Sequence, residues 1–126
     1  MIVTVYFTAL GLLLGSFYNL AADRLPRGES LLTPRSHCRA CGRKLGFVEL
    51  IPVAGYLLLR GKCSNCGVPI GIGSPLVEAI SGSTFAVPLL LFGVWPGLGI
   101  GVALNVAWGG CVVGLGFRLR RRSPQQ

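Results

Sequence analysis

The sequence predicts an all-α integral membrane protein with three transmembrane helices and one cytoplasmic, zinc-ribbon-like loop. Three observations lead to this fold class. Only 13% of the 126 residues are charged, about half the share that soluble globular domains carry. Long uncharged runs interrupt the charged segments, as membrane spans do. Four of the five cysteines form two C-x-x-C pairs inside the main polar segment.

The first predicted span covers residues 2–22, a run of 21 residues without a charge. At about 1.5 Å per residue, such a helix crosses a hydrocarbon core of about 30 Å. A cleaved signal peptide is the alternative. However, no basic residue precedes the run, and the Asp-Arg-Leu-Pro segment at 23–26 is a poor cleavage site. We therefore expect a retained helix, with residues 1–22 as the first division of the chain.

The second charge-poor stretch, residues 75–117, is interrupted only by Glu78. It is too long for one crossing and fits two crossings joined by a tight turn. The Trp-Pro-Gly segment at 95–97 predicts the turn, because proline restricts the residue before it and glycine tolerates unusual dihedral angles. Ser74 is a suitable N-cap, with Pro75 at the first helical position. The predicted second and third spans are residues 75–94 and 98–117.

The basic residues predict the orientation of these helices. Eight of the 12 lie in the loop 23–74, four lie in the tail 118–126, and none lies at the 95–97 turn. By the positive-inside rule, the loop and the C-terminus face the cytoplasm and the N-terminus faces outside, with lipid around the spans. The same flanking residues explain the formal net charge of +8, so we expect no binding of nucleic acid.

The four paired cysteines are the predicted metal ligands. Each pair reads C-x-x-C-G, and the two pairs enclose 21 residues, just beyond the usual spacing of four-cysteine zinc sites. Each turn aims two thiolates at one point, and two turns complete a tetrahedral Zn²⁺ site with no open position for substrate. We therefore expect a structural zinc. The ligands are Cys38, Cys41, Cys63 and Cys66.

Other uses of these cysteines remain open. A cytoplasmic loop disfavours disulfides, and a thioredoxin-like pair would need a βαβ context that the sequence lacks. Four thiolates would also accept an iron–sulfur cluster. His37 stands next to the first pair and could replace one ligand, although a solvated loop residue is the simpler interpretation. Cys111 lies within the third span and is interpreted as a small apolar filler.

Two further patterns concern packing. Residues 45–59 between the cysteine pairs are apolar but too short to span a membrane, so we expect them to lie in the lipid interface or against the spans. Gly-x-x-x-Gly spacings occur in or beside the spans and permit close helix approach, although a glycine-rich chain produces some by chance. They are Gly11/Gly15, Gly97/Gly101 and Gly110/Gly114.

The acidic residues limit the catalysis that this sequence can support. There are only four, and His37 is the only histidine. Asp23 ends the first span beside Arg24, which suggests an ion pair or a helix-end charge. Glu78 lies one turn into the second span, where an ionisable side chain suggests function but where the helix dipole also favours a carboxylate. The remaining acids are Glu29 and Glu49.

A series of motifs in one register resembles a known family. They include Gly15-Ser16-Phe17-Tyr18-Asn19, Arg24-Leu25-Pro26, Pro34-x-Ser36-x-Cys38-x-x-Cys41, Leu50-Ile51-Pro52, Leu59-Arg60-Gly61-x-Cys63-x-x-Cys66, Pro69-Ile70 and Pro75-x-x-Glu78. Over about residues 11–82 the sequence resembles the N-terminal region of type IV prepilin leader peptidase/N-methyltransferases, the membrane aspartyl peptidases of type IV pili and type II secretion. Ser74 departs from that pattern, since the family commonly has tyrosine there.

The resemblance implies a bacterial inner-membrane location, a zinc-binding role for the four-cysteine loop, prepilin as substrate and S-adenosylmethionine as methyl donor. In that family, cleavage depends on two aspartates in later spans, one within Gly-x-Gly-Asp. This sequence has no Asp after Asp23, and an aspartyl mechanism needs two carboxyls sharing a proton. We therefore expect no catalytic residue here.

The predicted function is that of an N-terminal domain in prepilin processing, acting with a separate chain that carries the aspartates. The alternatives are a non-catalytic membrane zinc-ribbon scaffold for pilus or type II secretion assembly, and a truncated, inactive paralogue. Methyl transfer is not expected from the residues themselves, because no glycine-rich cofactor loop on a βα unit is present.

Overall fold

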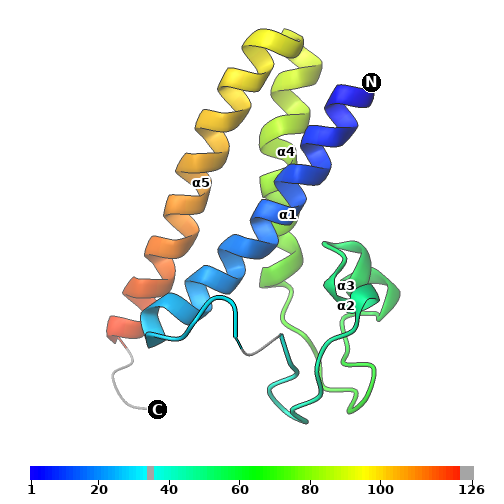
Figure 1. Ribbon diagram of the computed structural model, residues 1–126, viewed down its shortest axis with the longest axis vertical. Coiled ribbons are helices and arrows are strands. Elements are labelled where there is room, and N and C mark those ends of the chain that lie inside the picture. Colours follow the sequence, from blue (N-terminus) through cyan, green and yellow to red (C-terminus); the bar gives the residue numbers. More distant parts are fainter. Residues whose placement is uncertain (34–35, 123–126) are drawn as a thin grey trace.

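The computed structural model describes residues 1–33 and 36–122, and its three long helices stand side by side (Figure 1). They are α1 (Ile2–Arg24), α4 (Gly73–Phe92) and α5 (Val94–Arg122). All three are long and apolar enough to cross a membrane. Within the described ranges the fold has no strand, only two isolated β-bridges. The predicted all-helical class and its three spans are confirmed.

The ends of the helices divide the molecule into two poles. The N-terminus and the α4–α5 turn lie together at one pole, while the polar segment between α1 and α4 folds at the other, near the end of α5 (Figure 1). Three short helical elements lie in the described part of that segment: η1 (Leu25–Arg27), α2 (Phe47–Leu50) and α3 (Ala54–Leu58). This arrangement puts the cysteine segment and the basic end of α5 at the same pole, as the predicted topology requires.

The turn between the last two helices lies earlier than predicted. Gly93 alone connects α4 to α5, with a φ of 78° that favours glycine. Segment 95–97 is helical and belongs to the first turn of α5, where Pro96 costs little because backbone N–H groups there have no helical acceptor. The predicted break at 95–97 is therefore wrong.

Two other boundaries also differ from the prediction. α4 begins at Gly73, with Ile72 as its N-cap, so Ser74 lies inside the first turn instead of capping it. α5 continues through the basic residues to Arg122, because arginine is a good helix former and positive charge is favourable at a helix C-terminus. Residues 123–126 of the predicted tail, and residues 34–35 of the loop, lie outside the described residues.

Two of the three predicted glycine spacings mediate helix contacts. A Cβ on Gly11 would lie 2.5 Å from the Ser81 carbonyl oxygen in α4, and one on Gly15 would lie 2.7 Å from the Cα of Glu78. Gly97 and Gly101 approach the other side of α4 in the same way. The third pair, at 110 and 114, has no atom within 4 Å of either Cβ position. The sequence spacing alone does not distinguish the contacting pairs from the exposed one.

A small polar network joins the three helices inside the bundle. Asn105 of α5 is 2% exposed; its Oδ1 accepts a hydrogen bond from the Tyr18 hydroxyl at 2.7 Å. Its Nδ2 donates to the Thr84 hydroxyl at 2.9 Å and to the Ser81 carbonyl at 3.2 Å. In an apolar environment, such bonds stabilise one register of the helices against others.

Candidate metal centre

Two turns of nearly identical backbone present the four paired cysteines. In the cysteine turns, residues 38–43 and 63–68, the first cysteine N–H donates to the carbonyl five residues later at 2.9 Å. The glycine after each pair donates back to the first cysteine carbonyl, at 2.8 and 3.0 Å. These glycines, Gly42 and Gly67, have φ values of 70° and 69°, in the left-handed region that other residues rarely adopt. The glycine in each C-x-x-C-G motif is therefore needed to close its turn.

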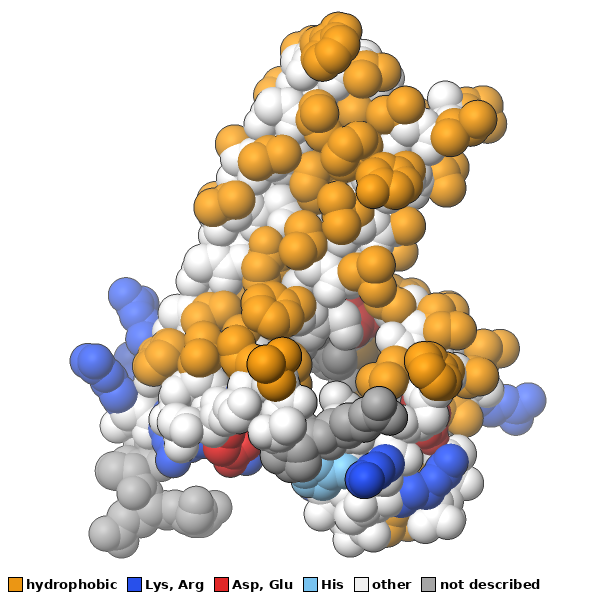
Figure 2. All heavy atoms as spheres, in the orientation of Figure 1, with side chains coloured by type: hydrophobic (Ala, Val, Ile, Leu, Met, Phe, Trp, Pro, Cys, Tyr) orange, Lys and Arg blue, Asp and Glu red, His pale blue; other side chains and the backbone are white. Residues whose placement is uncertain are grey.

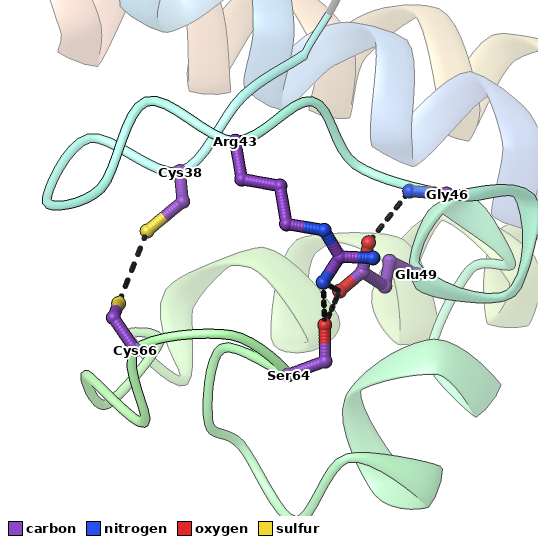
Figure 3. A network of polar contacts seen from close by, with 6 residues as sticks. All are labelled: Cys38, Arg43, Gly46, Glu49, Ser64 and Cys66. Atoms are coloured by element: carbon purple, nitrogen blue, oxygen red, sulfur yellow. Dashed lines mark hydrogen bonds and ion pairs between the residues drawn. The ribbon is translucent and has the colours of Figure 1, made fainter.

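The two turns face each other and gather their sulfur atoms into one cluster. All four Sγ atoms lie within 4.8 Å of one another. The sulfurs of Cys38 and Cys66, on opposite turns, are 3.7 Å apart (Figure 3). Four sulfurs at about 2.3 Å from a tetrahedral ion would be about 3.8 Å apart, whereas a disulfide requires about 2.05 Å. The arrangement fits a metal ion and not a disulfide. The cluster consists of the predicted set, Cys38, Cys41, Cys63 and Cys66.

The two turns shift the pKa values of their cysteine thiols in different directions. The pKa of Cys41 is lowered to about 6 by the backbone N–H of Arg43 and by the Asn65 side chain. The pKa of Cys63 is also lowered, by backbone N–H groups of its own turn. Although the Val68 N–H acts in the opposite direction, desolvation and the neighbouring thiols raise the pKa of Cys66 to about 11. Because thiolates are the metal-binding form, the lowered pKa favours the Cys41 sulfur as a ligand near neutral pH.

Glu49 links the two cysteine turns on the side away from the sulfurs. Its carboxylate accepts hydrogen bonds from the Gly46 backbone N–H, at 2.6 Å, and from the Ser64 hydroxyl (Figure 3). Arg43 donates to Ser64 and lies 3.6 Å from Glu49. The hydrogen bonds from Ser64 and Gly46 hold the pKa of Glu49 below its usual value, so the carboxylate is ionised at neutral pH. Gly46-x-x-Glu49 forms the return half of a capping box at α2, a sequence signal that could have identified this role.

The first cysteine turn is tied to the end of α1. Asp23 accepts from Arg39, which lies in that turn, and forms an i,i+4 pair with Arg27 at 3.1 Å. Asp23 therefore forms ion pairs at the end of the first span, as expected, and these include Arg27 and Arg39. The neighbouring Arg24 is 6% exposed and donates to the Ser30 carbonyl at 2.9 Å. Both side chains position the loop where it leaves α1.

Glu78 ties the middle of the loop to α4. Its side chain is buried, 6% exposed, and Oε2 accepts the Val53 backbone N–H at 2.7 Å between α2 and α3. The Ser74 hydroxyl, one turn earlier in α4, lies 3.4 Å from Oε1. Asn19 of α1 donates to the Ser74 carbonyl at 3.0 Å. The carboxylate is a structural acceptor in this arrangement, a role that the sequence left undecided between function and helix-end charge.

A cavity of about 580 Å³ separates the cysteine turns from the helix bundle. Its walls include Asn19 of α1, Tyr56 of α3 and Cys63, and three of the four acidic residues border it. The three acids are Asp23, Glu49 and Glu78. Each of them accepts a hydrogen bond or ion pair from a different part of the loop. Asp23 and Glu78 connect the loop to the bundle, whereas Glu49 connects the two cysteine turns with each other.

The remaining candidates lie apart from the sulfur cluster. His37 is exposed, and its residue pairs with Lys44 in an isolated β-bridge at the base of the first cysteine turn. Cys111 is exposed on α5, as expected for a residue of the third span. Among the described residues, neither joins the four cysteines that could hold a metal ion.

The sequence matches one family model. The bacterial peptidase A24 N-terminal domain covers residues 9–92, from the middle of α1 to the end of α4. This region contains both cysteine turns, the Glu49 link and the contacts of α1 with α4. No solved structure matches the chain.

Several relatives carry names from prepilin processing. The prepilin leader peptidase/N-methyltransferase of Myxococcus xanthus is 44% identical over 89 residues, which cover 71% of this chain and 27% of that protein. The enzyme of the same name from Bacillus subtilis is 42% identical over 84 residues, 67% of this chain and 34% of the relative. An Escherichia coli type 4 prepilin-like proteins leader peptide-processing enzyme is 33% identical over 124 residues, 82% of this chain and 45% of the relative.

The chain thus spans less than half the length of these relatives. The match nevertheless includes two thirds of its own length and every residue of the sulfur cluster. With its three apolar helices, the chain fits a bacterial membrane protein. It belongs to the bacterial peptidase A24 N-terminal domain family.

Proposed function

We propose that this chain acts in prepilin leader processing as the N-terminal domain, together with a separate chain that carries the catalytic aspartates. The observation that supports it most is the family match, which extends over both cysteine turns and their contacts with α1 and α4. The relatives' names describe leader peptidases and N-methyltransferases. The chain has no Asp after Asp23, and its own carboxylates at the cavity are engaged in holding the loop.

We further propose that the four cysteines bind one structural Zn²⁺. The 3.7 Å separation of the Cys38 and Cys66 sulfurs supports a tetrahedral site. Four thiolate ligands leave no position for water or substrate, so the ion would brace the loop and take no part in chemistry. The ion would join two loop segments that polar side chains also connect.

The proposed orientation places the cysteine loop and the C-terminus in the cytoplasm of a bacterial inner membrane. The support is the asymmetry of basic residues, with eight in the loop, four at the end of α5 and none at the α4–α5 turn. Reporter fusions at Ser30 and after Arg122 should both report cytoplasm, and a fusion at Gly93 should report the outside. A cytoplasmic signal at Gly93 would contradict the orientation.

Methyl transfer belongs to this proposal only through the relatives' names. S-adenosylmethionine would be the methyl donor, as the family resemblance implies, and we assign no residue of this chain to binding it. Transfer of the methyl group from the sulfur of that donor to an amine nitrogen is therefore not an expected property of the isolated chain.

The decisive experiment measures leader cleavage. The purified 126-residue chain should leave a prepilin leader uncut, and a membrane chain that carries Gly-x-Gly-Asp should restore cleavage when reconstituted with it. The Cys38→Ser variant should lower the restored cleavage, while Cys111→Ser should not. Cleavage by the chain alone would overturn the proposal that a separate chain supplies the catalytic aspartates. No stimulation of the aspartate chain would favour a non-catalytic zinc-ribbon scaffold or an inactive paralogue.

A further inference from the structure

The helices α2 and α3 form a short hairpin with an apolar outer surface. We call residues 47–58 the loop hairpin. Phe47 is 91% exposed, and Leu57 and Leu58 are 67% and 68% exposed. Further exposed apolar side chains on the hairpin are Val48, Leu50 and Ile51. Gly55 is the one buried residue of the two helices. So much apolar surface on two helices of four and five residues is unfavourable in water.

The position of the loop hairpin along the bundle suggests what covers this surface. The hairpin lies beside the first turns of α4 at the loop pole, closer to the middle of the bundle than the cysteine turns are (Figure 1). Apolar side chains gather over it as they do over the long helices, whereas Lys and Arg side chains stand at the loop pole and at the edges (Figure 2). The adjacent start of α4 also exposes apolar residues, namely the N-cap Ile72 and, within the helix, Leu76 and Ile80.

The contact with Glu78 fixes the position of the hairpin along the axis of α4. Glu78 lies five residues after Gly73, the start of α4, which corresponds to about 7.5 Å along the helix axis. Its Oε2 holds the Val53 N–H at the turn of the hairpin, at 2.7 Å. Helices that lie in the membrane interface bury their apolar face about 5–10 Å deep. The turn is therefore held at interfacial depth relative to the apolar helix beside it.

The backbone at this contact is strained. Val53 has a φ of 58°, a conformation that is rare for a β-branched residue and costs about 1–3 kcal/mol. The Glu78 acceptor is a buried carboxylate that gains a hydrogen bond when Val53 takes this conformation. This hydrogen bond offsets the strain and anchors the hairpin to α4.

Basic residues border the apolar surface on both sides. Arg43 and Lys44 precede α2, and Arg60 and Lys62 follow α3. All four are exposed. Cationic side chains at the edge of an apolar surface complement the anionic headgroups of a bilayer.

We propose that the loop hairpin is immersed in the headgroup and upper acyl region of the bilayer beside α4, and that Glu78 sets its depth. The partner surface is a phospholipid bilayer that contains anionic lipid. The apolar hairpin continues the lipid-facing surface of α4, and the cysteine turns then lie just outside the bilayer. This inference requires only that the three long helices cross a membrane. It is independent of prepilin processing.

Quenching by brominated lipid tests the immersion. Trp95 and Trp108 are replaced by Phe, and a single Trp is introduced by Phe47→Trp, or by Lys44→Trp as the matched control three residues away. In vesicles of phosphatidylcholine and phosphatidylglycerol brominated near the top of the acyl chains, Phe47→Trp should be quenched at least about twofold more than Lys44→Trp.

Two outcomes would overturn the immersion. Equal, weak quenching of both variants would mean that the hairpin stands in water. Weak quenching of Phe47→Trp combined with a blue-shifted emission would mean that protein covers the surface, either a second copy of this chain or another partner. Because neither readout involves cleavage, failure here is distinguishable from failure of the proposed function.

Substitutions at Glu78 test the depth. In the Phe47→Trp background, Glu78→Gln keeps an acceptor for Val53 and should keep the ratio of quenching by shallow and deep bromines. Glu78→Ala removes the acceptor and should shift that ratio towards shallow bromines, with the metal content verifying that the loop is folded. An unchanged ratio in Glu78→Ala would overturn the role of Glu78. If Glu78→Ala loses the metal, amide exchange at Val53 in the unmodified chain decides: protection supports the anchor, and free exchange overturns it.

Discussion

The helix bundle and the cysteine loop reach order by different means. Among the described residues, three of the four buried apolar residues belong to the bundle, namely Ala21, Phe85 and Leu89, and the fourth is Cys63. Backbones in the bundle approach closely at glycines such as Gly11. The loop has two turns, a polar link and a sulfur cluster. A segment with so little apolar core depends on cross-links, so the loop should be sensitive to the metal and the bundle to side-chain volume.

The largest effect should follow from loss of a sulfur ligand. Cys38→Ser and Cys66→Ser should each abolish binding of about one Zn²⁺ per chain, because a structural site contributes about 10–16 kcal/mol of apparent binding free energy. The loop should become sensitive to proteases while the helical content of the bundle persists. Metal analysis and limited proteolysis measure this, with Cys111→Ser as control. Full metal retention in both loop variants would contradict the four-sulfur site.

The number of protons released on metal binding should reveal that the thiols differ in pKa. At pH 7.5, metal binding should release fewer than four protons per chain, because the Cys41 pKa of about 6 leaves that thiol mostly ionised while the Cys66 pKa of about 11 leaves it protonated. Isothermal calorimetry in buffers of different ionisation enthalpy counts these protons. A count of four would show that all four thiols are protonated before binding.

The metal-free loop should also lose stability on acidification. The Cys41 pKa is lowered from about 9 to about 6. This group therefore contributes stability that is full above pH 9 and is lost as the pH falls through 6. Proteolysis of the metal-free chain at pH 8 and pH 5 should show the loop cleaved faster at pH 5, with the bundle unchanged. Equal cleavage at both values would argue against a lowered pKa.

A substitution at a contacting glycine should break the bundle and spare the loop. Gly15→Ala places a Cβ 2.7 Å from the Glu78 Cα, and such overpacking costs about 1–3 kcal/mol. Gly114→Ala is the matched control, since nothing lies within 4 Å of its Cβ position. Thermal unfolding in detergent should show a lower midpoint for Gly15→Ala alone. Equal midpoints for the two variants would mean that α1 does not pack on α4 through Gly15.

The smallest effect is expected in the polar network of the bundle. Asn105→Ala removes hydrogen bonds to Tyr18, Thr84 and Ser81, and interhelical bonds of this kind are worth about 0.6 kcal/mol each, with about 1.7 as the largest measured. Tyr18→Phe should be nearly silent in the Asn105→Ala background and destabilising in the wild type. Additive effects of the two substitutions would show that Tyr18 and Asn105 do not interact.

Local sequence patterns predicted much of this fold. The uncharged runs identified all three long helices, and the repeated C-x-x-C-G pattern identified both cysteine turns, because each depends on residues close in sequence. The same locality explains the agreement between glycine spacing and helix contact at Gly11 and Gly15. The exposed pair at 110 and 114 shows the limit, since spacing does not tell which face of a helix meets a neighbour.

Contacts between distant residues were not predictable in the same way. Asp23 forms an ion pair with Arg39, sixteen residues away, which the sequence did not indicate. Glu78 binds a backbone N–H, which has no identity in the sequence, so no residue pattern could indicate Val53 as its partner. We predicted the α4–α5 turn at Pro96 because proline restricts the residue before it. In the structure, Gly93 alone makes the turn.

The unequal lengths of α4 and α5 have a consequence for the choice of bilayer. α4 has 20 residues and α5 has 29, or about 30 Å and about 44 Å of helix. The apolar part of α5, residues 94–117, accounts for about 36 Å of that length. An apolar stretch longer than the hydrocarbon thickness tilts, and arginine side chains at its end extend to the headgroups. Because α4 already matches an average bilayer, thinner membranes should increase the tilt of α5 while Arg118 and Arg120 stay at the phosphates. Oriented infrared spectra in lipids of increasing acyl length should record a falling mean tilt, so hydrophobic mismatch would be accommodated mainly by one helix.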